Sequence, residues 1–267
     1  MRTFWTAIST LGLVGILVPA PASAQQSDTV TPATHVDDTY RSPFFDLHPE
    51  LTKDEFEEFT AELGSVLRSR PLGDATTLGR GKVDVSVQFA NMPIDDSKGA
   101  WNNTTSRPTA DHHRSRSLSF PRVSARFGVS DRVEVGAVGG LAPHANYGLV
   151  GADTRIALVK QGPARPVSVS VRPSFTLLVA PSEVLVGNAG IDLSVSRAYG
   201  PVSPYAGVAA STSGAVERSK NVNLDPVSAG ASLAYAGLSY RWRPLILSAE
   251  VEKGDQVRYA FGIGTRF

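Results

Sequence analysis

The last twelve residues, QVRYAFGIGTRF (256–267), carry the clearest structural signal in the chain. Mostly apolar or aromatic residues recur at every second position from Val257 to Phe267. The positions between them hold only small residues and two arginines, Arg258 and Arg266. A period of two is typical of a β-strand with two different faces. The stretch therefore predicts a strand with one apolar face and one face of small and basic side chains.

This strand, with its terminal Phe267, resembles the last strand of bacterial outer-membrane β-barrels, which ends in an aromatic residue recognised by the barrel-assembly machinery. The string GVSDRVEVG (128–136) resembles the periplasmic hairpins of the same class. The resemblance covers residues 79–267 and concerns the class, not one characterised family. It implies an integral outer-membrane protein of a Gram-negative-type bacterium. It also implies membrane lipid and the assembly machinery as partners, and Phe267 as the assembly signal.

The N-terminal stretch, residues 1–24, predicts a secretory signal peptide. Arg2 gives the positive start, residues 4–18 are mostly apolar, and Ala22-Ser23-Ala24 forms a small-x-small cleavage pattern. A membrane anchor is disfavoured because the apolar run is short and is followed by Pro19. The protein is therefore expected to leave the cytoplasm.

Composition narrows the possible classes of protein. The chain has no cysteine, which excludes disulfides and a lipidated N-terminal cysteine. Of 26 basic residues, 25 remain once Arg2 is removed with the signal peptide, against 25 acidic residues. This balance argues against a nucleic-acid-binding protein. Because the mature chain lacks a run of about 18 apolar residues, it can cross a membrane only as a closed barrel.

The segment before the barrel is expected to contain one helix. Residues 25–50 predict a disordered lead-in, and residues 51–78 a periplasmic helix and linker. In the helix, Leu51 to Arg70, Thr52 and Glu55 form a capping box, and Pro71 with Gly73 ends it. Arg68 and Arg70 are expected in the last turn, where they would complement the helix dipole.

One face of this helix is apolar: Phe56, Phe59, Leu63, Val66 and Leu67. Two interpretations stay open. In the first, the stripe is buried against the barrel, either on its periplasmic rim or inside its mouth. In the second, the helix docks a partner or gates the barrel.

Alternating segments predict an all-β fold for residues 79–267, a transmembrane antiparallel up-and-down β-barrel of about ten strands. Eight or twelve strands stay possible, because the seventh and eighth segments are rich in alanine and glycine. Pro121 predicts a bulge that switches the facing of the second strand. The strands are expected near residues 83–89, 117–127, 133–139, 147–158, 167–177, 188–196, 202–210, 230–242, 245–252 and 256–267.

The connections predict how the barrel is oriented. Those near 128–132, 160–165, 197–201 and 241–244 are short, whereas 92–114 and 211–226 are longer. Periplasmic turns are short in such barrels and outer loops are longer. An even strand count then places both chain ends, with the N-terminal segment, in the periplasm. Aromatic residues near strand ends predict interfacial girdles: Phe89, Phe127, Tyr147, Phe175, Tyr240, Trp242 and Phe267.

The polar faces of the strands predict the lining of the lumen. Positive and negative charges balance in this set, and Arg258 and Arg266 have candidate partners in Glu250 and Glu252. Either arginine–carboxylate pairs close the lumen, or the charges line a narrow watery path for small solutes. The predicted lining residues are Asp84, Arg122, Arg126, Glu134, Asp153, Arg155, Arg172, Asp192, Glu250, Glu252, Arg258 and Arg266.

The sequence favours a passive function: a narrow channel for small solutes, or a structural or surface-interaction barrel. The alternative is an outer-membrane hydrolase, a protease or lipid-modifying enzyme, that acts through the first outer loop. That loop holds Asp95, Asp96, Asp111, His112 and His113, which resemble distantly the outer-rim aspartate–histidine group of ten-stranded outer-membrane proteases. No catalytic, cofactor or metal residue is assigned, since no phosphate-binding glycine loop or nucleophile elbow stands out.

Overall fold

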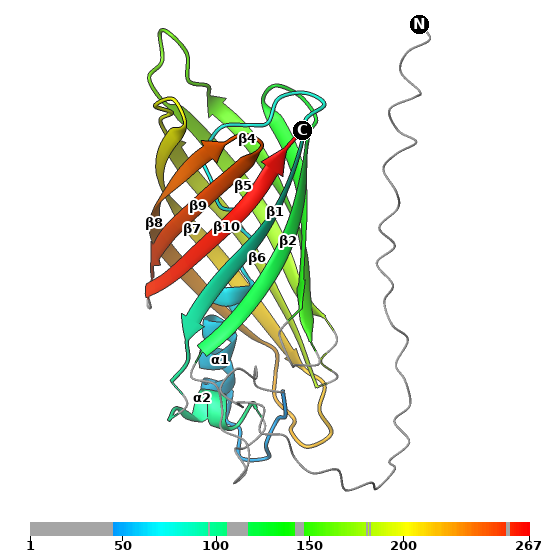
Figure 1. The fold of residues 1–267 in the computed structure, drawn as a ribbon. Coiled ribbons are helices and arrows are strands. Elements are labelled where there is room, and N and C mark those ends of the chain that lie inside the picture. The colour runs from blue at the N-terminus through cyan, green and yellow to red at the C-terminus, as the bar shows by residue number, and fades with distance from the viewer. Residues whose placement is uncertain are drawn as a thin grey trace, which may run out of the picture. The chain divides into compact units, whose positions relative to one another are not determined.

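The computed structural model describes residues 45–95, 97–105, 117–141, 147–179, 181, 183–254 and 257–267. The predicted signal peptide and most of the predicted lead-in lie outside these residues. Among them, no helix is long and apolar enough to cross a membrane. The elements, drawn in Figure 1, are α1 (Lys53–Leu67), β1 (Val83–Pro93), α2 (Gly99–Asn102), β2 (Ser117–Gly128), β3 (Val133–Leu141), β4 (Gly148–Val159), β5 (Ser168–Val179), β6 (Val184–Ser196), β7 (Val202–Glu217), β8 (Val227–Trp242), β9 (Leu245–Lys253) and β10 (Val257–Arg266).

The ten strands form one closed up-and-down barrel. Each strand pairs antiparallel with its neighbour in sequence, and β1 pairs with β10 to close the ring. The closing register places Asp84 opposite Arg266 and Phe89 opposite Phe261. The predicted strand number, pairing and terminal strand are confirmed. Closure matters because it leaves no row of unpaired backbone groups facing lipid.

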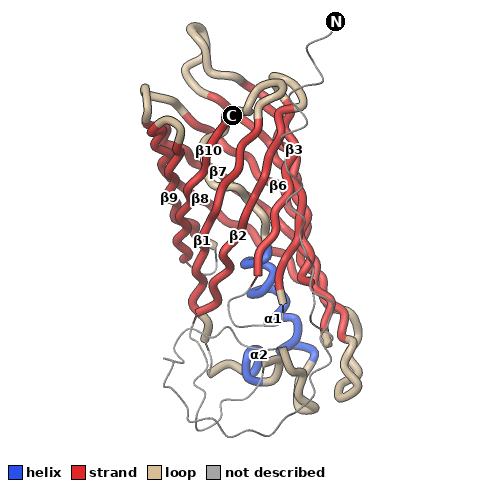
Figure 2. Tube along the Cα trace, turned by 45° about the vertical axis from the view of Figure 1, so that its right-hand side comes forward, coloured by secondary structure: helices blue, strands red, loops and turns tan. Residues whose placement is uncertain are grey.

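The two ends of the barrel differ, and we name them by what they hold. The turn end holds the four turns β2–β3, β4–β5, β6–β7 and β8–β9, together with the start of β1 and the C-terminus. There Val83 N donates to Phe267 O at 3.1 Å. The helix end holds α1, α2 and the connections β1–β2, β3–β4, β5–β6, β7–β8 and β9–β10. Figures 1 and 2 show both helices at the end opposite the C-terminus.

The barrel wall is apolar outside and polar inside, which defines the class of transmembrane β-barrels of the outer-membrane type. Along β6, for example, Ile191 and Leu193 are exposed on the outer face while Asp192 is buried on the inner one. The outward apolar side chains include Phe89, Val123, Phe127, Val150, Leu158, Phe175, Leu238, Tyr259, Phe261 and Ile263. The predicted alternation of the strands therefore reflects lipid-facing and lumen-facing sides.

The N-terminus of α1 is capped as predicted. Thr52 Oγ1 accepts from Glu55 N at 3.3 Å, and Glu55 Oε2 accepts from Thr52 N at 3.0 Å. The hydrogen bond that Thr52 N donates to the Glu55 carboxylate is the main reason why the pKa of Glu55 lies below its ordinary value. The C-terminus differs from the prediction. The helix ends at Leu67, where Arg68 N donates to Gly64 O at 3.0 Å, and Arg68 and Arg70 lie beyond it.

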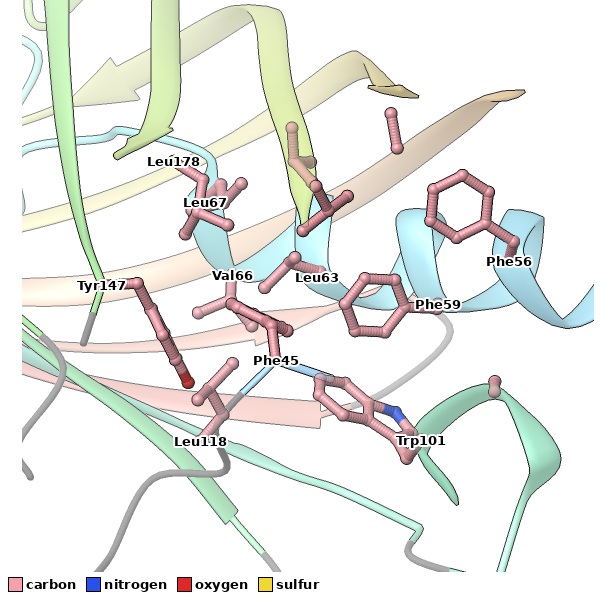
Figure 3. Packing of buried hydrophobic residues seen from close by; sticks show 14 of the residues in the cluster. Phe45, Phe56, Phe59, Leu63, Val66, Leu67, Trp101, Leu118, Tyr147 and Leu178 are labelled. Carbon is pink, nitrogen blue, oxygen red and sulfur yellow. The ribbon is translucent and has the colours of Figure 1, made fainter. Parts of the chain in front are cut away.

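An apolar cluster closes the helix end of the barrel (Figure 3). Phe59 of α1 packs edge-on against Trp101 of α2, with ring centroids 5.2 Å apart. The ring centroids of Phe45 and Tyr147 are 4.3 Å apart. Phe45 and Leu47, near the end of the predicted lead-in, are buried in this cluster. The helix therefore fills the barrel mouth, at the end opposite to the one where the C-terminus and the turns lie.

This cluster explains two wrong predictions about the strands. Leu118 is buried and faces inward like Arg122, and the β1–β2 register runs through Pro121 without interruption, so the strand does not switch its facing there. Tyr147 is buried and does not belong to an interfacial girdle. In both cases the inner side of the barrel is apolar because α1 and its neighbours occupy it.

Polar contacts hold α2 onto α1 at the edge of the apolar cluster. Lys98 Nζ donates to Glu58 at 2.7 Å and to Glu62 at 3.0 Å, and Trp101 Nε1 donates to Glu62 at 2.5 Å. The hydrogen bonds to Glu58 and then Glu62 raise the pKa of Lys98 above its ordinary value. The first connection of the barrel is thereby tied to the helix that closes its mouth.

Gly64 provides a test of how closely α1 docks on the wall. A Cβ at this position would overlap the Cβ and Oγ of Ser213 on β7. We expect Gly64→Ala to destabilise the folded barrel by about 1–2 kcal/mol through overpacking, although alanine is the better helix former. Thermal loss of the compact, heat-modifiable form on a gel measures this.

Two variants make this test specific. Gly230→Ala is the matched control, because nothing lies within 4 Å of a Cβ added there. Ser213→Gly removes the opposing side chain, but also the oxygen that accepts from Asn188 Nδ2 at 2.9 Å, so the double variant should regain part of the lost stability. A Gly64→Ala protein as stable as the control would show that the helix does not dock as described.

Candidate functional site: the filled lumen

The chain passes through its own barrel between α1 and β1. We call residues 68–78 the inner segment. It leaves α1 at the helix end and reaches the turn end, where Thr77 Oγ1 donates to Asp131 O at 2.9 Å in the β2–β3 turn. Eleven extended residues span at most about 36–40 Å, enough to cross an apolar band about 25 Å tall. The segment then turns through Gly79, whose positive φ of 87° suits glycine, and enters β1.

Both arginines of the inner segment bind carboxylates of the wall. Arg68 contacts Asp192 at 3.0 Å and Glu252 at 3.1 Å. Arg70 contacts Glu252 at 3.3 Å and also pairs with Glu250. Its guanidinium lies 3.6 Å from the ring centroid of Tyr235. All of these charged groups are buried, where a carboxylate without a partner would be costly.

Arginines of the wall in turn donate to carbonyl groups of α1 and the inner segment. Arg122 donates to Arg68 O at 3.0 Å and also to Val66 O, and Arg258 donates to Ser65 O. Further along, Arg172 donates to Pro71 O at 3.1 Å and Arg155 to Thr76 O at 3.0 Å. The extended backbone has no strand partner here, so these arginines satisfy its carbonyl groups.

A second charged cluster closes the lumen towards the turn end. Glu134 contacts Arg126 at 2.7 Å and Arg155 at 3.3 Å, and accepts from Leu78 N at 2.8 Å. Nearby, Arg266 contacts Asp84 at 3.5 Å across the strand pair that closes the barrel. The wall and the inner segment thus form one network of charge and hydrogen bonds along the whole lumen.

All twelve residues predicted to line the lumen lie on the inner face of the barrel, and all but the half-buried Arg266 are buried. Arg258 pairs with Glu252 at 2.9 Å, as expected. Arg266 pairs instead with Asp84, and Glu250 with Arg70. Sequence reasoning missed Arg68 and Arg70, which it assigned to a helix C-terminus. Pro71 was the available signal for an earlier helix end, because a proline disfavours helical geometry at the residue before it, here Arg70.

Cavities remain in the lumen beside the inner segment. Two of about 30 Å³ each lie there, one near Arg126 and Ser248 and one near Arg122 and Glu252. A larger cavity of about 310 Å³ lies between α1 and β8 at the helix end, lined in part by Ser65, Leu233 and Arg258. The inner segment therefore occupies the lumen without filling it completely.

The predicted hydrolase site lies largely outside the described residues, since Asp96, Asp111, His112 and His113 are not among them. Asp95 is exposed, and its carboxylate accepts from Ser97 N and Oγ at 3.1 and 2.6 Å, which serves the local turn. Within the described part of the chain, no cluster of three histidine or acidic side chains could hold a metal ion.

Comparisons with known proteins extend to the fold alone. No protein-family model matches the chain, and no curated protein sequence matches it. Among solved structures, an outer membrane channel from Pseudomonas putida F1 has 11% identity and a TM-score of 0.45, over 75% of this chain and 100% of that one. Ail, the attachment invasion locus protein of Yersinia pestis, has 16% identity and a TM-score of 0.31, over 70% and 99%. The outer membrane protein OprG from Pseudomonas aeruginosa has 10% and 0.32, over 73% and 99%.

The charge network predicts a large effect of Glu252, which binds Arg68, Arg70 and Arg258. Glu252→Gln keeps the shape but leaves three buried guanidinium groups with less opposing charge. Because breaking a buried pair from one side is strongly unfavourable, we expect a loss of about 3 kcal/mol in stability. Thermal unfolding in detergent measures the change.

The matched control for this substitution is Asp225→Asn. This residue faces Lys53 at 4.0 Å on the surface and should change stability by less than about 0.5 kcal/mol. Equal effects of the two substitutions would contradict the role given to the buried network.

Proposed function

We propose that this protein is an outer-membrane barrel that is closed at rest and serves a structural or surface-interaction role at the helix end. One observation carries the proposal. The inner segment occupies the lumen. Its arginines form salt bridges with wall carboxylates, and its carbonyl groups accept hydrogen bonds from wall arginines. A lumen filled in this way does not conduct small solutes.

The orientation of the barrel supports an outward-facing helix end. Outer-membrane barrels keep short turns on the periplasmic side. Here four turns, the start of β1 and the C-terminus share one end, and Phe45 with α1 lies at the other. By this rule Phe45 and α1 lie on the side of the cell exterior. This proposal differs from the sequence-based expectation of a periplasmic N-terminal segment, which stays a prediction.

A gated channel is the second candidate function, favoured by how the inner segment is held. Its contacts with the wall are made by side chains, since it is not a strand of the barrel. Displacing it would leave a lumen lined by six arginines and six carboxylates, which water and small solutes can enter. The hydrolase alternative stays a prediction that the described residues do not support.

Epitope placement tests the orientation. A tag inserted between Gln26 and Ser27, after the predicted cleavage site, should bind antibody on intact cells. The same tag between Gly162 and Pro163, in the β4–β5 turn, should bind only after the outer membrane is permeabilised. The reverse pattern would show that the helix end faces the periplasm.

Conductance in planar bilayers separates the two candidate functions. We expect the wild-type protein to be silent, and Glu250→Gln/Glu252→Gln to open in bursts because the inner segment loses its charge partners. The protein has no cysteine, so Ala75→Cys/Ser196→Cys can tether the segment to β6, where Ala75 N lies 2.9 Å from Ser196 Oγ.

The tether is added to the charge variant to identify what opens. Openings that stop under oxidation and return with a thiol reductant would assign gating to the inner segment, with Ala75→Cys alone as the control. Steady conductance of the wild-type protein would overturn the closed resting state. A charge variant that folds but never opens would leave only the structural or surface-interaction role.

A further inference from the structure

The turn end of the barrel carries a strong positive charge. The segments that form it, 79–82, 129–132, 160–167, 197–201 and 241–244, contain eight basic residues and one acidic residue, Asp131. All eight are exposed: Arg80, Lys82, Arg132, Lys160, Arg165, Arg197, Arg241 and Arg243. We call this set the basic rim. The wall residues of the lumen do not balance this positive charge, because wall carboxylates equal wall arginines in number there.

The helix end has the opposite sign. Its described residues include eleven acidic side chains, Asp46, Glu50, Asp54, Glu55, Glu57, Glu58, Glu62, Asp95, Glu183, Glu217 and Asp225, and five basic ones, Lys53, Lys98, Arg218, Lys220 and Lys253. A near-neutral protein is thus divided into a basic and an acidic end. Solubility alone would not separate the charges, because mixed signs on both ends would serve it equally well.

The basic rim contains a formed cavity at the β8–β9 turn. This cavity has a volume of about 540 Å³. Four cations line it, Lys82, Arg241, Arg243 and Arg266, and the rest of its lining is Pro244, Ile246 and Phe267. Of the four, Arg266 is paired with Asp84. A site of this composition suits a ligand with an anionic head and an apolar part.

Exposed aromatic side chains place the basic rim at a membrane boundary. Tyr240 and Trp242 lie on the outer face of β8, and Phe267 and Tyr199 lie at the same end. Aromatic rings of this kind sit at the level of lipid headgroups. Arg241 and Arg243 flank Trp242 in sequence, so both lie at this end of the barrel, and Arg241 also lines the lumen cavity near Ser248.

We propose that the basic rim binds the phosphate groups of anionic phospholipids in the leaflet next to the turn end. The cavity lined by Lys82, Arg241 and Arg243 is its most structured part. Basic clusters beside a membrane attract anionic lipids, and arginine matches phosphate geometry with two parallel hydrogen bonds. An acidic protein partner would not need the flanking aromatic belt or the apolar lining. This inference goes beyond the proposed function, since an open or a closed barrel could carry it.

Native mass spectrometry of the detergent-solubilised full-length protein tests this inference, with phosphatidylglycerol and phosphatidylcholine of the same acyl chains as probes. We expect the wild-type protein to retain phosphatidylglycerol preferentially. Arg241→Gln/Arg243→Gln should weaken that retention about 30-fold, as expected for two charges each worth about a factor of five near an anionic leaflet. Arg241→Lys/Arg243→Lys keeps the charge and should retain most of the binding.

Arg218→Gln/Lys220→Gln is the matched control, because it removes two exposed cations from the β7–β8 connection at the helix end. Heat-modifiable migration confirms that each variant is folded. Equal retention of the two lipids by the wild-type protein would overturn the proposal, as would equal loss in the rim and control variants. Full competition by millimolar inorganic phosphate would also overturn it, by showing a phosphate site without a lipid requirement.

Discussion

The buried charges of the lumen are the constraint on which the rest of this structure depends. A closed barrel of ten strands points charged side chains into its interior, where they are buried and each charge needs a partner. The inner segment supplies some of these partners: Glu250 pairs with Arg70, and Arg172, which also lies 3.9 Å from Asp153, donates to Pro71 O. The inner segment completes the set with two cations and a row of carbonyl groups. It is therefore part of the barrel fold and not a separate plug.

The path of the inner segment determines the arrangement of everything before β1. Because β1 starts at the turn end, a chain that crosses the lumen first must begin at the helix end. There α1 needs an apolar environment for its stripe, and the barrel mouth provides it through inward residues such as Leu118 and Val186. The apolar closure of the mouth and the polar filling of the lumen are thus two parts of one continuous stretch of chain.

The sequence predicted the barrel well because alternation records the two faces of each strand. It does not record what stands inside the barrel, and the wrong predictions share this cause. Tyr147 was assigned to an interfacial girdle, and the strand that contains Leu118 was expected to switch its facing at Pro121, although α1 makes the inner side apolar at that level. Arg68 and Arg70 were assigned to a helix end because their wall partners, Asp192 and Glu250, lie more than a hundred residues away. The distribution of charge between the two ends also became visible only once the turns had been placed.

The same charges relate the closed state to any open one. If the inner segment leaves, its wall partners, among them Arg122, Arg172 and Glu250, lose their contacts together. Water must then enter to solvate them, since unpaired charges in a dry lumen would cost several kcal/mol each. Release of the segment and hydration of the lumen would therefore be one event. Whether the segment stays in place would depend on how well eleven residues of chain compete with water for six arginines and six carboxylates.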